Sequence, residues 1–114
     1  MPRPTGDLLQ GTLGILILKA LLAGPTHGYG IARWIEDTGD DVLRIEEGSL
    51  YPALRRLEDK ELVRSEWGLS ENKRQARYYT ITPAGRKHLR DEAVVWFRYA
   101  NAVTQILRAA PTPA

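Results

Sequence analysis

The chain of 114 residues has no cysteine, one phenylalanine and two histidines, His27 and His88. Without cysteine there are no disulfides, no thiolate metal sites and no thiol chemistry, which favours an intracellular, cytoplasmic protein. No serine stands in a nucleophile-elbow motif, and no glycine run has the spacing of a phosphate loop. We therefore expect no enzymatic activity, no cofactor and no metal site.

Long hydrophobic runs are also missing. The longest apolar stretch, residues 8–23, is interrupted by three polar residues and is shorter than the roughly 20 residues of a membrane span. Arg3 is isolated and Asp7 follows it, so the N-terminus lacks the basic start of a signal peptide. We expect a single compact domain without a membrane segment, because a chain of this length buries about two-thirds of its unfolded surface.

The net charge is only +2, but it is distributed unevenly. Residues 31–48 carry two cations and six anions, a net charge of −4, whereas residues 49–90 carry ten cations and five anions, a net charge of +5. The acidic cluster of Asp37, Asp40 and Asp41 lacks the spacing of a calcium loop and is expected at a solvated helix end. Positive charge gathered in one segment is typical of a surface that binds phosphate backbones.

The segment Glu46–Glu58 combines a helix start, an apolar stripe and a basic outer face. Its leucines recur at i, i+4 and i+7, which predicts one buried side, and another leucine follows the helix. These residues are Leu50, Leu54, Leu57 and Leu62. Pro52 is tolerated only in the first helical turn, so the helix is predicted to begin near Gly48 or Ser49.

The other face of this helix is small near its N-terminus and cationic further along. It is predicted to carry Ser49, Pro52, Ala53, Arg56 and Lys60, with Tyr51 and Arg55 one turn apart beside it. Such a face can enter the major groove of DNA. The alternative is an ordinary amphipathic helix with solvated arginines.

Two strands are predicted after this helix, at residues 63–67 and 78–81, because both segments alternate with period two. The polar connection between them, residues 68–77, is too long for a tight hairpin and is basic in its second half, with Lys73, Arg74 and Arg77. A helix followed by such a ribbon is typical of a wing that contacts phosphates while the helix contacts bases. A solvated loop is the alternative.

Two further helices are predicted upstream. Residues 13–23 are apolar nearly all round and end at Gly24, and after a turn at residues 27–30 a second helix runs to about Thr38. Tyr29 then lies at a helix N-terminus. Its side chain either contacts a phosphate or packs as a hydrophobic staple, and the pattern leaves both alternatives open. The pattern does not decide whether Trp34 is buried or exposed.

The C-terminal segment predicts one long helix, with Thr82 as N-cap and Pro83 at the first position. A stripe with spacings of 4, 3, 4, 3 and 4 follows: Leu89, Ala93, Trp96, Ala100, Val103 and Leu107. This heptad pattern requires a partner helix, which a second copy of the chain supplies, although the chain's own first helix is an alternative. Trp96, with Tyr99 and Ala100 nearby, frames a slot for an aromatic guest or is simply packed core.

Four segments in this order, over residues 8–108, resemble the PadR family of bacterial transcriptional regulators: Leu9–Leu13, His27–Ile31, Glu47–Glu58 and Tyr78–Thr82. The resemblance implies a winged helix-turn-helix domain, a homodimer, and repression through an inverted repeat, relieved in some members by small aromatic or drug-like molecules. It also places Tyr51, Pro52 and the following arginines in the recognition helix and residues 73–77 in the wing. The short C-terminal region resembles the small subgroup with a single C-terminal helix.

We thus predict an α+β, mainly α protein, with a winged-helix DNA-binding domain at residues 1–82 and a dimerisation helix at residues 83–110. The predicted DNA contacts are Tyr29, Ser49, Tyr51, Pro52, Arg55, Arg56, Lys73, Arg74 and Arg77. The predicted dimer interface comprises Leu8, Leu9, Leu89, Ala93, Trp96, Ala100, Val103 and Leu107, and the predicted effector site comprises Trp96, Tyr99 and Ala100. The alternative function is a winged-helix module that binds proteins rather than DNA.

Overall fold

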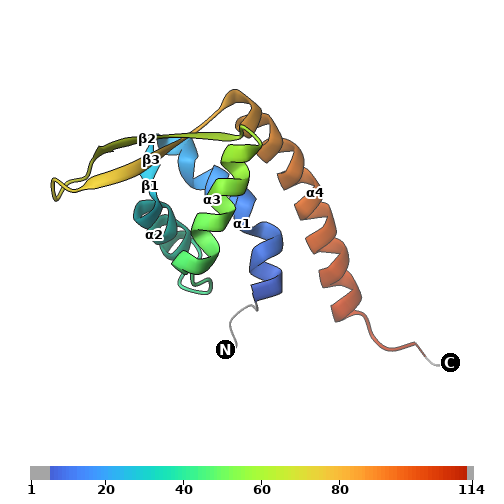
Figure 1. Ribbon diagram of the computed structural model, residues 1–114. Helices are drawn as coiled ribbons and strands as arrows, with labels where there is room; N and C mark the ends of the chain where they lie inside the picture. The colour runs from blue at the N-terminus through green and yellow to red at the C-terminus, as the bar shows by residue number, and fades with distance from the viewer. Residues whose placement is uncertain (1–5, 113–114) are drawn as a thin grey trace.

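The computed structural model describes residues 6–112. The elements are α1 (Gly6–Ala20), the 3₁₀ turn η1 (Leu21–Ala23), β1 (Thr26–His27), α2 (Gly28–Thr38), α3 (Glu47–Asp59), β2 (Val63–Leu69), β3 (Gln75–Ile81) and α4 (Pro83–Arg108). Figure 1 shows α1, α2 and α3 grouped beside a ribbon of β2 and β3 that projects to one side, with α4 on the other side. The predicted fold class, α+β and mainly α, is confirmed.

The core lies where α1, α2 and α3 meet the sheet. The predicted stripe of α3 is confirmed, because Leu50, Leu54 and Leu57 are buried together with Leu62 just beyond the helix. The prediction for Ala53 was wrong: its side chain is only 2% exposed. It follows Leu50 by three positions and therefore lies on the core side of the helix.

The three strands form an antiparallel sheet in the order β1-β3-β2, with Val63 paired to Ile81 and Leu69 to Gln75. Both long strands extend further than predicted, so the expected ten-residue connection was wrong. The loop comprises only residues 70–74, and two backbone hydrogen bonds at Ser70 close it. The strand β1 was not predicted, because two residues are too few to show a period.

The helix α2 begins at Gly28, so part of the predicted turn is already helical. The N-cap is His27, whose ring Nδ1 accepts a hydrogen bond from the Gly30 N–H at 3.0 Å. This bond satisfies one of the free N–H groups of the first helical turn. Tyr29 therefore lies at the helix N-terminus as predicted, and Trp34, which the pattern left open, is 39% exposed.

The predicted start of α4 is confirmed. Thr82 accepts a hydrogen bond from the Gly85 N–H at 2.9 Å and donates one to the Glu61 carbonyl at 2.8 Å. A Cβ at Gly85 would collide with the Leu62 carbonyl oxygen, so glycine permits this close approach. No helix among residues 6–112 is long and apolar enough to cross a membrane.

Candidate nucleic-acid interface

The face of α3 opposite the core is open to solvent. Ser49, Pro52, Arg55 and Arg56 are exposed, and neither arginine forms an ion pair with any residue that the structure describes. Because α3 follows α2 after the connection of residues 39–46 and leads into the β2–β3 ribbon, this face has the position of a recognition helix beside its wing (Figure 1). Two unpaired guanidinium groups there can bind guanine edges or phosphates.

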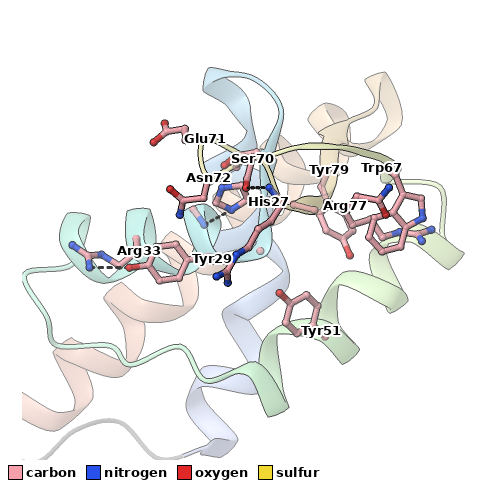
Figure 2. A pocket seen from close by; sticks show the side chains of 16 residues that line it. His27, Tyr29, Arg33, Tyr51, Trp67, Ser70, Glu71, Asn72, Arg77 and Tyr79 are labelled. Carbon is pink, nitrogen blue, oxygen red and sulfur yellow. Dashed lines mark hydrogen bonds between the residues drawn. The ribbon is translucent and has the colours of Figure 1, made fainter.

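A groove of about 800 Å³ separates the start of α2 from the ribbon. Figure 2 shows Arg33 and Tyr29 of α2 at one side, Trp67 and Arg77 of the ribbon at the other, and Tyr51 of α3 between them. A second hollow of about 410 Å³ continues along α3, sharing Tyr51 and Arg77 with the first. The two hollows form one trough between the recognition helix and the wing, with aromatic and cationic walls.

Tyr51 is positioned by a glycine of the preceding helix. A Cβ built on Gly28 would lie 2.7 Å from the Tyr51 hydroxyl oxygen and 2.9 Å from Cζ, which is closer than non-bonded atoms approach. Gly28 is buried, whereas the Tyr51 side chain is 45% exposed. The missing side chain at Gly28 thus provides the space for the ring that lies over the start of α2.

Arg77 joins the wing to the C-terminal end of α3. Its Nε donates a hydrogen bond to the Ser65 Oγ at 2.8 Å, and its Nη2 lies 3.6 Å from a Glu58 carboxylate oxygen. Ser65 in turn donates a hydrogen bond to the same carboxylate oxygen. The guanidinium carbon lies 5.5 Å from the centre of the Trp67 ring. Since both charges are partly exposed, the ion pair contributes orientation more than stability.

A second cation, Arg33, accompanies Tyr29. Its Nη1 donates a hydrogen bond to the Tyr29 hydroxyl at 3.4 Å, and its Nη2 lies 3.9 Å from the Asp37 carboxylate. The Tyr29 hydroxyl and then Asp37 hold the pKa of Arg33 above its usual value. Tyr29 is exposed rather than packed as a staple, so both side chains face the trough.

The trough brings together most of the predicted DNA contacts. Its walls contain Tyr29, Tyr51, Pro52, Arg55, Arg74 and Arg77. The others, Ser49, Arg56 and Lys73, are exposed outside it. Sequence reasoning missed Arg33 and Trp67. The signals were present, because Arg33 is one helical turn after Tyr29 and Trp67 lies two residues after Ser65 on the same face of the strand.

The predicted dimer residues have different surroundings. Leu89, the first residue of the α4 stripe, is buried in the chain's own core, as the alternative of packing within the chain expects. Leu9 of α1 packs against the same core. Leu8, Trp96 and Leu107 are exposed, and Ala93, Ala100 and Val103 are half-buried. The open part of the stripe therefore begins at Ala93. Among residues 6–112, no group of histidine, aspartate and glutamate side chains could hold a metal ion.

A helix-turn-helix followed by a β-ribbon, with a cationic trough between them, defines a winged-helix DNA-binding regulator. Residues 17–91 match the transcriptional regulator PadR-like family. The chain therefore belongs to the PadR-like family of transcriptional regulators.

Solved structures with the same fold include a transcriptional regulator from Clostridium thermocellum, with a TM-score of 0.81 and 30% identity over 90% of this chain and 100% of that one. A PadR family transcriptional regulator from Eggerthella lenta has a TM-score of 0.75 and 34% identity, covering 91% of this chain and 88% of that one. A 37.1 kDa protein in a transposon of Streptomyces fradiae is 49% identical over 89 residues, 78% of this chain. The match spans only 24% of that larger protein.

Proposed function

We propose that this protein is a transcriptional repressor that binds an inverted-repeat operator as a homodimer. Each recognition helix α3 enters the major groove, and each wing contacts the adjacent backbone. The observation that supports this proposal best is the trough between α3 and the ribbon, because predicted contacts from α2, α3 and the wing line one continuous surface. Ser49, Arg56 and Lys73, which are exposed outside the trough, are proposed as further contacts.

The homodimer is supported by the apolar surface of α4. Beyond Leu89 no residue of the heptad stripe belongs to the buried core of the described chain. A second row at spacings of 4, 3 and 4 runs beside the stripe and is exposed: Val95, Tyr99, Ala102 and Ile106. Together the rows are wider than one helix contact covers, which favours packing against more than one helix of a partner. The exposed Leu8 of α1 extends the same proposed interface. In this proposal residues 1–82 form the DNA-binding domain and residues 83–110 the dimerisation helix, and α1 adds to the interface through Leu8.

The proposed effector is a small aromatic compound bound between two α4 helices. Trp96 is partly exposed, and the Phe97 ring stands edge-on to it with centroids 5.8 Å apart. The small side chains of Ala93 and Ala100 leave room beside the indole, and Tyr99 is exposed nearby. We expect planar phenolic or cationic compounds to quench tryptophan emission, and we expect Trp96→Ala to abolish this quenching while Trp34→Ala retains it.

The test of DNA binding is a salt titration with a labelled mixed-sequence duplex, followed by selection from a random-sequence library. If each subunit neutralises about three to five phosphates, the log-log slope should be roughly −5 to −9. The selected sequences should contain an inverted repeat with half-sites about one helical turn apart. A flat salt response would contradict DNA binding, and selected sequences without symmetry would contradict the dimeric arrangement.

A further inference from the structure

The wall of the trough on the wing side carries an exposed indole that the proposed function does not yet use. Trp67 lies near the middle of β2 and is 64% exposed, although an aromatic ring of this size is usually buried. It faces the same groove as Tyr51 and Tyr29 (Figure 2). Exposing an indole at this place is unfavourable unless a binding partner covers the ring.

The ring of Trp67 is held in place. Trp67 of β2 is paired with Arg77 of β3, and the Arg77 guanidinium carbon lies 5.5 Å from the centre of the Trp67 ring. Arg77 itself is fixed by Ser65 and by Glu58 of α3. The arginine that stacks on the indole is therefore bound to the end of the recognition helix, so the position of the ring is linked to the position of α3.

The indole also has a free polar group. Its N–H makes no hydrogen bond to any residue between 6 and 112, and tryptophan can only donate. In the proposed function the recognition helix occupies the major groove and the wing contacts the adjacent backbone, so the DNA strand that borders this groove passes between the helix and the wing. That strand presents deoxyribose surfaces and phosphate oxygens, which match an apolar ring and a free donor.

We propose that Trp67 is a DNA-backbone contact, in which the indole packs on a deoxyribose and its N–H donates to a phosphate oxygen, and that Arg77 positions it. The inference rests on the proposed function, since it assigns one more contact to the same surface. It carries no base preference, because sugars and phosphates are alike in all sequences.

The test compares variants on a labelled mixed-sequence duplex at low salt. Trp67→Ala should weaken binding about tenfold, in the range of one lost hydrogen bond to a charged group, and Trp67→Phe should weaken it less because an aromatic ring remains on the sugar. The matched control is Leu69→Ala, on the same face of the same strand and 68% exposed but outside the groove, which should bind like wild type. Thermal unfolding of each variant checks that the fold is retained.

A fluorescence measurement tests the contact and its positioning separately. DNA should change tryptophan emission in wild type and in Trp34→Phe, but not in Trp67→Phe. In a background that carries Trp34→Phe and Trp96→Phe, where Trp67 is the remaining tryptophan, Arg77→Gln should lower the emission anisotropy, while Arg77→Lys, which keeps the charge, should restore part of it. If wild type binds the duplex and Trp67→Ala binds within twofold of it, the inference is overturned and the proposed function stands. If wild type does not bind DNA, the proposed function itself fails.

Discussion

Gly28 lies directly against the ring of Tyr51, so that a Cβ on the glycine would stand 2.7 Å from the tyrosine hydroxyl oxygen. The two residues belong to different helices, α2 and α3, and to segments 23 positions apart in the sequence. Their contact fixes an exposed aromatic side chain of the recognition helix over the N-terminus of the preceding helix. The orientation of Tyr51 toward the trough therefore depends on a residue without a side chain.

Gly28→Ala should push the Tyr51 ring away and weaken DNA binding more than it weakens the fold. The ring is exposed and can swing outward, so we expect a stability loss of only about 1 kcal/mol, at the low end for overpacking. A double-mutant cycle with Tyr51→Ala, measured by urea unfolding and by DNA binding, checks this. Because Tyr51→Ala removes the clash, the two losses should not be additive. Additive losses would mean that the glycine acts through its backbone.

The two groups of basic residues should differ in what they recognise. Arg56→Ala should weaken binding to the selected inverted repeat more than binding to mixed-sequence DNA, because a recognition-helix arginine contacts base edges. The double substitution Lys73→Ala and Arg74→Ala at the wing tip should weaken both about equally. Binding isotherms on the two duplexes decide this. Equal effects in all variants would show that base and phosphate contacts are assigned incorrectly.

Replacing Val103 and Leu107 with glutamate should produce folded monomers. Leu107 is 79% exposed and Val103 is half-buried, so within one chain the charges meet solvent, whereas in a dimer they would be buried at a cost of several kcal/mol. Sedimentation and circular dichroism measure the two properties. The matched control is Gln105→Glu on the opposite side of α4, which should remain dimeric. A folded dimer of the double variant would place the two-fold contact elsewhere.

Glu61→Gly should stabilise the protein by about 1 kcal/mol. Glu61 has a φ of 60° in the left-handed region that favours glycine. It lies just beyond the C-terminal end of α3, where two backbone hydrogen bonds close the helix. The Leu62 N–H donates to the Leu57 carbonyl oxygen, and the Glu61 N–H donates to the Glu58 carbonyl oxygen. Lys60→Gly, with φ at −88°, should bring no such gain. Thermal unfolding of both variants provides the comparison.

Stability at alkaline pH should depend on Tyr79. Burial raises the pKa of this phenol above its usual range, so the unfolded chain loses the proton at lower pH than the folded chain. The protonated phenol contributes fully to the free energy of unfolding below about pH 10, the usual tyrosine pKa. This contribution is lost as the pH rises through the pKa of Tyr79 in the folded protein. Tyr79→Phe should therefore lose less stability than wild type between about pH 9 and 11 in urea unfolding. An unchanged pH profile would contradict this account.

Local patterns were sufficient for most of the elements. The spacing of Leu50, Leu54 and Leu57 predicted the buried side of α3, and Thr82 with Pro83 predicted where α4 begins. These signals depend only on helix period and on the preferences of helix ends, which act over a few neighbouring residues. The same reasoning predicted a basic face on α3 and a basic wing after it in the chain. It failed at Ala53, which was predicted on the outer face of α3. Its helical position next to the core leucines places this residue on the buried side.

What the sequence determined by itself is thus the four helices, the presence of the two longer strands, the core stripe of α3, the N-cap of α4 and the concentration of positive charge in residues 49–90. Only the tertiary structure decided that Gly28 makes room for Tyr51, that Arg77 is bound to Glu58, and that the part of the α4 stripe at Leu89 belongs to the chain's own core. The physical reason is that periodicity and capping are local properties. Contacts between residues far apart in the chain depend on how complete elements pack, and no short segment encodes that packing alone.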